Sequence, residues 1–153
     1  MNNKARRSER GTQLLELALV LPLLLFLAML VTEGADFIRV HQVLNNAARE
    51  GAKFSSMPEN SCNGDTTCLT AIQNVVVNYA NNNHVTITTA NVVVNQQASR
   101  VIPAASVTGF WLSQVSVSYS YPIIYLRIAP GFAIPSTILL RGVSQFQNFY
   151  GNN

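Results

Sequence analysis

The sequence is poor in the residues that usually perform catalysis or hold a metal ion. Its 153 residues include only two histidines, two cysteines and seven acidic residues. Beyond residue 55 the only acidic residues are Glu59 and Asp65, and both lie in a polar stretch. The sequence also lacks a glycine-rich phosphate loop, a nucleophile elbow and a metal-ligand spacing. We therefore expect no enzyme, no metal site and no cofactor.

Most of the chain also lacks a net charge. Residues 1–11 contain Lys4, Arg6, Arg7 and Arg10 against Glu9, whereas basic and acidic residues balance in the remainder. The overall excess of +3 is therefore concentrated at one end of the chain. A basic surface of the kind that binds nucleic acid would need that excess on the folded domain. We accordingly expect no nucleic-acid partner.

One long apolar run stands near the N-terminus. From Leu14 to Val31 the only side chain that is not apolar is that of Glu16, apart from Pro22. At about 1.5 Å per residue this run extends roughly 27 Å as a helix, close to the hydrocarbon thickness of a bilayer. It predicts a membrane-spanning helix. The basic residues before it place the N-terminus in the cytoplasm and everything after Val31 outside.

Two cysteines, Cys62 and Cys68, bracket a short polar stretch that is typical of a turn. Outside the cytoplasm the default state of such a pair is a disulfide. The rival interpretation is a metal pair, which would need about two further ligands. Only His41 and His84 are available for that, and their spacing matches no known metal site. We favour the disulfide.

Glu16 is the feature that a simple export signal does not explain. A cleaved secretory signal peptide usually has a shorter apolar region, and no convincing cleavage site follows this one. An uncleaved signal anchor fits the length and the charge. Neither accounts for a carboxylate in lipid, which costs on the order of 3 kcal/mol at the centre of a bilayer and less near an end. A carboxylate at such a place normally marks a function with a partner.

The N-terminus resembles a type IV prepilin signal, because a basic leader ends in Gly11, Thr12 follows, and Glu16 is the fifth residue after the glycine. The resemblance implies that a membrane-embedded prepilin peptidase cleaves after Gly11 on the cytoplasmic face. It also implies that Glu16 pairs with the free α-amine of a neighbouring subunit. In a helix Thr12 and Glu16 are about one turn apart on the same face, which suits such a pairing.

The resemblance can be narrowed to the TadE-like family, the pilin-like proteins of the tight-adherence (Flp) pilus system. It rests on Gly11, Glu16 and Pro22, on Glu33-Gly34, and on the sequence Ala-Ala-Arg-Glu-Gly-Ala at residues 47–52. Leu17 stands where phenylalanine is common in this family, and the major Flp pilins are far shorter than this chain. These differences favour a minor pilin or pseudopilin that helps pilus initiation, assembly and surface adherence.

The partners that this resemblance implies are the prepilin peptidase, other pilin-like subunits, the pilus assembly machinery and the membrane. The expected location is the bacterial cytoplasmic membrane, with the N-terminus inside and the remaining domain outside, or a surface pilus after assembly. Two alternatives stay open. One is an uncleaved, signal-anchored envelope protein whose outer domain binds a partner. The other is a pseudopilin of a type II secretion system, which would have a similar N-terminus.

The helix is expected to continue beyond the membrane to about residue 55, because apolar and small residues recur at three- and four-residue steps from Phe37 to Gly51. Ala47, Ala48 and Gly51 would permit close packing of another element. Arg49 and Glu50 stand between them, and the motif is either a packing face or a direct contact with another subunit. Pro22 is either a tolerated kink or a weak point at which the helix bends or melts.

The sequence predicts an α+β fold with a leader at 1–11, a transmembrane helix at 12–32, its amphipathic continuation at 33–55 and a head at 56–153. Residues 69–82 have a helical pattern. Residues 84–95 and 114–121 alternate as strands do, and the stretch from residue 136 closes the chain as another strand. A second helix on an antiparallel sheet of about three or four strands is the expected head. The apolar connection at 122–136 either covers the core or docks a partner, and Phe110 and Trp111 are expected at the edge of the core.

Overall fold

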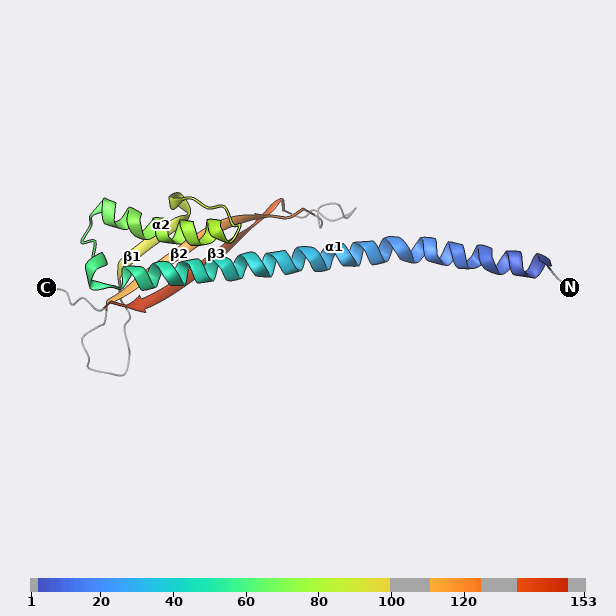
Figure 1. Ribbon diagram of the computed structural model, residues 1–153, viewed down its shortest axis with the longest axis horizontal. Coiled ribbons are helices and arrows are strands. Elements are labelled where there is room, and N and C mark those ends of the chain that lie inside the picture. The colour runs from blue at the N-terminus through green and yellow to red at the C-terminus, as the bar shows by residue number, and fades with distance from the viewer. Residues whose placement is uncertain (1–2, 100–110, 125–134, 149–153) are drawn as a thin grey trace. The chain divides into compact units, whose positions relative to one another are not determined.

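The computed structural model describes residues 3–99, 111–124 and 135–148 of the chain. Its helices are α1 (Asn3–Ser55) and α2 (Thr66–Asn82), with short 3₁₀ turns η1 (Pro58–Asn60) and η2 (Thr89–Asn91). Its strands are β1 (Val92–Ser99), β2 (Trp111–Pro122) and β3 (Thr137–Gln147), as Figure 1 shows. This is the α+β fold that the sequence predicts, with a long N-terminal helix, a second helix and an antiparallel sheet.

The chain divides into two compact units. The first, which we call the helical unit, is Met1–Asp36 with Ile123–Ser136, and the second, the head unit, is Phe37–Pro122 with Thr137–Asn153. Helix α1 contributes to both units, with its apolar first part in the helical unit and its amphipathic last part in the head unit. The described side chains from Gln13 to Met29 are all exposed, so the helical unit has no core of its own along this stretch.

The sheet of the head unit has the strand order β1-β2-β3, and both pairs are antiparallel. Strand β2 is central, so its residues face partners on both sides: Val117, for example, lies between Val92 and Gly142. Val115, Val117 and Tyr121 are buried and share one face of β2, as the alternation over residues 114–121 predicts. Ser116 is also buried although it belongs to the other face of the strand, and Tyr119 is only half-buried.

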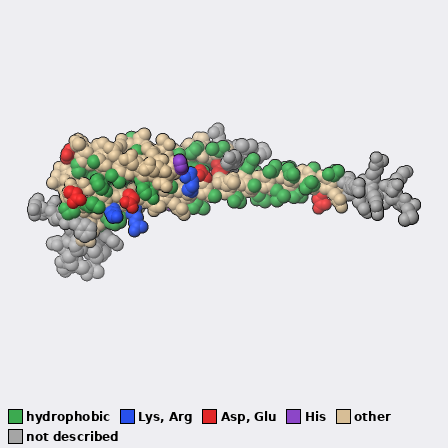
Figure 2. Space-filling model, viewed as in Figure 1, with side chains coloured by type: hydrophobic (Ala, Val, Ile, Leu, Met, Phe, Trp, Pro, Cys, Tyr) green, Lys and Arg blue, Asp and Glu red, His purple; other side chains and the backbone are tan. Residues whose placement is uncertain are grey.

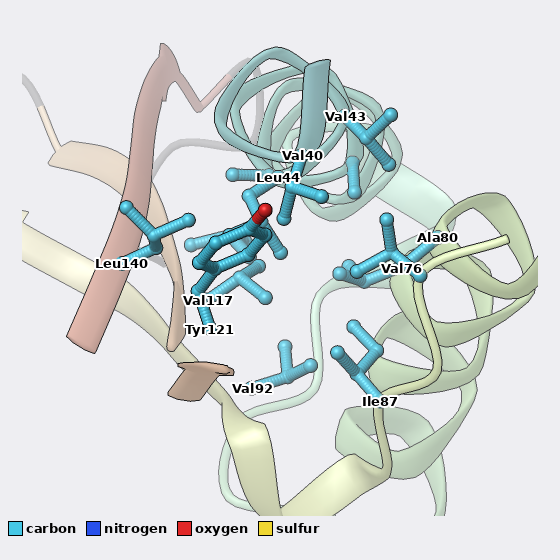
Figure 3. Close-up of a cluster of buried hydrophobic side chains, with 14 of the residues drawn as sticks. Val40, Val43, Leu44, Val76, Ala80, Ile87, Val92, Val117, Tyr121 and Leu140 are labelled. Carbon is cyan, nitrogen blue, oxygen red and sulfur yellow. The ribbon is translucent and has the colours of Figure 1, made fainter. Parts of the chain in front are cut away.

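Side chains from α1, α2 and the sheet meet in one core (Figure 3). Helix α1 supplies Val40, Leu44, Ala47, Ala48 and Ala52, all at the three- and four-residue steps of an amphipathic helix. Helix α2 supplies Val76 and Ala80, and the strands supply Val92, Val115, Val117 and Leu140. The predicted amphipathic continuation of α1 is therefore confirmed, and its apolar stripe is covered by the chain's own head.

Glycine 142 sets the distance between β3 and α1. A Cβ atom built at this position would lie 2.6 Å from the carbonyl carbon and oxygen of Leu44 and 2.9 Å from the backbone nitrogen of Asn45. These atoms belong to the helix backbone, which cannot rotate away as a side chain could. Strand and helix therefore touch at a point that has room for a hydrogen atom but none for a methyl group.

Helix α2 begins three residues before its predicted start at Leu69. The reason is Asp65, whose carboxylate accepts a hydrogen bond of 2.9 Å from the backbone N–H of Thr67 and so caps the helix. The helix ends at Asn82, as the run of three asparagines predicts. His84 then adopts a left-handed conformation, with φ 61°, which turns the chain toward the sheet.

The predicted strand over residues 84–95 is correct only in its last part, because β1 begins at Val92. The side-chain amide oxygen of Asn91 accepts hydrogen bonds from the backbone N–H and the hydroxyl of Thr88, at 2.9 and 3.0 Å. These bonds close the turn η2 in place of a strand ladder. Val85 and Ile87 are nevertheless buried, so the alternation in the sequence reflects burial without strand pairing.

The connection between β2 and β3 is described only at its two ends. Ile123 is buried, Ile124 is exposed, and the backbone N–H of Ile123 donates to the carbonyl of Ser136 at 3.1 Å. Residues 125–134 and Phe110 lie outside the described residues. Whether the connection covers the core or docks a partner therefore stays a prediction. Trp111 is the first residue of β2 and is 39% exposed, and it is not among the described side chains that pack against the core, so its predicted packing at the edge of the core is not observed.

Candidate functional site

The apolar part of α1 exposes its side chains all around. Leu14, Leu15, Leu17 and Leu19 are each more than half exposed. The other large apolar side chains up to Met29 are also exposed, some of them less strongly, and so is Val31, whereas Leu30 is half-buried. Figure 2 shows hydrophobic groups covering this part of the helix. Among the described residues one helix is long and apolar enough to span a membrane, with a mean hydropathy of 2.8 over an 18-residue window that is 0% buried. A face of this kind needs lipid or other apolar helices around it.

Glu16 interrupts this apolar surface. Its side chain is exposed, and within the described part of the chain no hydrogen bond or ion pair reaches its carboxylate. Gly11 and Thr12 precede it in the same helix, and Thr12 lies four residues before Glu16, about one helical turn. The structure thus places the predicted cleavage position and the predicted pairing residue at one end of one helix.

Pro22 lies inside α1, which continues through it without a break. Proline has no N–H, so the carbonyl of Ala18 cannot receive its usual helical hydrogen bond. In a bilayer that unpaired carbonyl weakens the helix one turn before Pro22. The geometry is compatible with both predicted roles of Pro22, the tolerated kink and the local weak point.

The motif at residues 47–52 has two faces. Ala47, Ala48 and Ala52 are wholly buried in the core, and a Cβ atom added to Gly51 would collide with the side chain of Val76 in α2. The small residues are therefore used for packing within this chain. Arg49 and Glu50 are exposed on the opposite side of the helix, so the packing role does not explain them.

Arg49 and Glu50 line a surface hollow of about 400 Å³. The hollow is completed by Asn46 and Lys53 of α1, by Tyr79 of α2 and by Phe146 of β3. Sequence analysis singled out Arg49 and Glu50 and missed the rest. No sequence pattern could have placed Tyr79 and Phe146 beside Arg49, because they come from segments far away in the sequence.

Cys62 and Cys68 form a disulfide, with their Cα atoms 5.3 Å apart. The sulfurs are bonded to each other, in agreement with the disulfide that the sequence favours over a metal pair. The backbone N–H of Cys62 donates to the side-chain oxygen of Gln96 in β1 at 3.0 Å. The disulfide loop is thereby tied to the sheet.

Gln96 is the centre of a polar cluster that sequence analysis missed. Its side-chain nitrogen donates to the hydroxyl of Ser55 at 2.9 Å and to the carbonyl of Asn60 at 2.7 Å. The hydroxyl of Ser113 in β2 donates to that of Ser55 at 2.6 Å, and both serines are buried. The cluster therefore joins the end of α1, the turn η1, β1 and β2. It is a structural site, because its polar groups bind one another.

In the helical unit, Glu33 forms a long-range hydrogen bond that the sequence did not predict. Its carboxylate accepts a hydrogen bond of 2.7 Å from the backbone N–H of Ile124, which is 91 residues away in the sequence. Glu33 lies two residues beyond Val31, where the apolar run ends. The bond holds the first residues of the β2–β3 connection at this end of the apolar segment.

The comparisons with known proteins concern the N-terminal part of the chain. No curated protein and no solved structure matches the sequence. Residues 11–53 match the model of the family described as TadE-like protein, a segment that includes Glu16, Pro22 and the motif with Arg49 and Glu50. This match confirms the resemblance to the TadE-like family that was seen in the sequence, over the N-terminal part of the chain.

Proposed function

We propose that the protein is a minor pilin or pseudopilin of a tight-adherence pilus, and a structural component rather than an enzyme. It is synthesised with the leader at residues 1–11 and cleaved after Gly11 by a prepilin peptidase. It is then held in the cytoplasmic membrane by residues 12–32, with the head outside, until it helps to initiate or extend the pilus and its attachment to surfaces.

The observation that carries this proposal is the exposed apolar helix with one carboxylate, Glu16, inside the segment that matches the TadE-like family. In lipid an unpaired carboxylate is costly and an unpaired ammonium is equally so. When two subunits meet, the new α-amine at Thr12 and the carboxylate of Glu16 can neutralise each other across neighbouring helices. The pairing makes association favourable only after cleavage, because the uncleaved chain has no amine at that position.

Cleavage after Gly11 requires the helix to unwind locally, and a glycine at this position makes that easier. Helix α1 runs through Gly11 and Thr12, and a peptidase needs an extended strand of substrate. Glycine is about 1 kcal/mol less favourable than alanine in a helix, so the helix unwinds more easily there. A side chain at position 11 would both strengthen the helix and obstruct the peptidase.

The experiment that tests the proposal measures the intact mass and the N-terminal sequence of the protein, made with and without its cognate prepilin peptidase. The expected product begins at Thr12 only when the peptidase is present. A Gly11→Ala or Gly11→Val variant should keep the leader. Gly34→Ala is the matched control, because a Cβ at Gly34 meets no atom within 4 Å and that position lies in the same helix, far from the cleavage position.

A chain that keeps Met1 in the presence of an active peptidase would contradict the proposal. It would favour the signal-anchored envelope protein, and Glu16 would then need another partner. Cleavage together with association only with type II secretion pseudopilins would favour the second alternative. The subunits that co-purify with the cleaved chain distinguish these two cases.

A further inference from the structure

An exposed polar stripe runs along α1 within the head unit. It consists of side chains at alternating steps of three and four residues, which we call the basic seam: Arg39, Gln42, Asn46, Arg49 and Lys53. All of them are exposed, whereas the buried stripe of the same helix packs on α2 and the sheet. Steps of three and four residues place side chains in one line along a helix, which is the arrangement that a second helix contacts.

The seam contains positive charges and no carboxylate. Arg39 donates a hydrogen bond of 3.2 Å to the carbonyl of Asn83, so its guanidinium has a partner within the chain. Arg49 and Lys53 form no ion pair with any part of the chain that the structure describes. Glu50 lines the same hollow as Arg49 and Lys53, but it forms no ion pair with either of them. The second half of the seam, with the hollow that it lines, therefore presents two cations and one carboxylate, none of them in an ion pair within the described residues, and its excess charge is positive.

The same half of the seam borders the surface hollow. Asn46, Arg49 and Lys53 line it together with Tyr79 and Phe146. Both aromatic rings are half-buried, so each offers part of its apolar surface to a molecule lying over α1. An aromatic flank of this kind excludes water from a charge pair and strengthens it.

We propose that the basic seam docks an acidic helix of a different pilin-like subunit, with carboxylates opposite Arg49 and Lys53. The inference rests on the function proposed above and adds which surface is used and which chemistry the partner must have. Charge complementarity identifies the occupant, because the unpaired cations of the seam need anions at helical spacing. Amides at Gln42 and Asn46 accept or donate hydrogen bonds along the same line.

A second copy of this chain does not fit the seam. Two seams facing each other would place Arg39, Arg49 and Lys53 of one copy against the same cations of the other, in either helix direction. Like charges at close approach are unfavourable and select against such a pairing. The seam therefore favours a mixed assembly over a filament of identical copies, which agrees with the role of a minor subunit.

The test places a photoactivatable amino acid at Asn46 of the full-length chain, co-expressed in membranes with the pilin-like subunits of its own pilus, one at a time. A cross-link from position 46 to a helix of one such subunit is expected. Arg49→Glu should reduce that cross-link and the co-purification of the pair by about tenfold or more. Replacing the facing carboxylate of the partner by arginine should restore both.

Arg141→Glu is the matched control, because it makes the same change of charge at an exposed position of β3 outside the seam. It should leave the cross-link unchanged. Thermal unfolding of both variants should match that of the unmodified protein, since neither position is buried.

Three outcomes would overturn the docking proposal. The cross-link could be insensitive to Arg49→Glu, position 46 could cross-link to a second copy of this chain, or it could cross-link to lipid. Each of these leaves the proposed function intact if the subunits still co-purify. If the unmodified chain is cleaved by the peptidase but associates with no pilin-like subunit, the docking proposal and the proposed assembly role both fall.

Discussion

At the level of single residues, Glu16 is a charge on an exposed apolar helix for which we propose a specific use. Its carboxylate lies among exposed leucines in a helix of membrane-spanning length. The sequence was sufficient to identify it, because a charge in an apolar run is visible without any structure. Its partner could not be predicted in detail, since the proposed amine belongs to another molecule and is created only by cleavage.

Glu16→Ala should leave processing after Gly11 unchanged but reduce incorporation into complexes with other pilin-like subunits by at least about tenfold, because it removes the charge pair. Glu16→Gln is the control for size, and it should show the same defect if charge is what matters. The measurement is the ratio of assembled to free protein in membrane and pilus fractions. Incorporation of Glu16→Ala at the normal level would rule out the pairing mechanism.

The buried serines illustrate a site that no local pattern could reveal. Ser113 donates its hydrogen bond to Ser55, which is 58 residues away in the sequence. Each serine alone is typical of an exposed or loop position. Only the fold shows that the two hydroxyls, together with Gln96, satisfy one another in the interior.

Ser113→Ala should lower the free energy of unfolding by about 1 kcal/mol, the usual net value of one hydrogen bond. The loss stays small because the hydroxyl of Ser55 still accepts a hydrogen bond from Gln96 at 2.9 Å. Ser120→Ala on the same strand is the control, because Ser120 is exposed. Denaturant unfolding of the full chain in micelles measures both, and equal midpoints for the two variants would contradict the argument.

At the level of elements, the contact between α1 and β3 depends on one missing methyl group. Gly142→Ala would drive a Cβ atom into the backbone of Leu44 and Asn45. Because the helix backbone cannot give way locally, we expect β3 to shift and the free energy of unfolding to fall by about 1–3 kcal/mol.

Thermal unfolding of Gly142→Ala, compared with Gly34→Ala, checks this expectation. A methyl group at Gly34 meets no atom within 4 Å. Gly34→Ala should therefore not lower the midpoint, also because alanine is favoured in helices. A Gly142→Ala protein as stable as the unmodified one would show that strand and helix have room between them.

Some of the helices and strands could be predicted from the sequence, and others could not. The inward stripe of α1 from Val40 to Ala52 was predictable because one face of a helix repeats every three or four residues. The early start of α2 was missed because it depends on the cap at Asp65, which the apolar periodicity does not include. Residues 84–91 alternate as a strand does, yet the hydrogen bonds between Thr88 and Asn91 close a turn there.

The candidate site was predictable only where it is continuous in the sequence. Gly11, Glu16 and Arg49-Glu50 are parts of one helix and were identified directly. The hollow beside Arg49 includes Tyr79 and Phe146, which tertiary folding alone brings to it. The contact of Glu33 with Ile124 likewise joins residues that no local pattern connects.

At the scale of the whole molecule, exposed apolar and core-forming surfaces occupy successive parts of one helix. Up to Met29 the described side chains of α1 are exposed, whereas from Val40 onward one face of the same helix is buried. The change occurs where the apolar run ends and the acidic residues Glu33 and Asp36 follow. One continuous element therefore carries the proposed membrane segment, a wall of the core and, on its remaining face, the proposed docking surface.

The contact between α1 and Gly142 has a consequence for biosynthesis. Strand β3 is near the C-terminal end of the sequence and is therefore synthesised late. Its last residue leaves the ribosome about 95 residues after Ala52. At 5–20 residues per second, the inward face of α1 therefore waits roughly 5–20 s for the strand that closes over it. If the head is exported as proposed, the chain crosses the membrane with this stripe uncovered, and the core is completed only when β3 arrives.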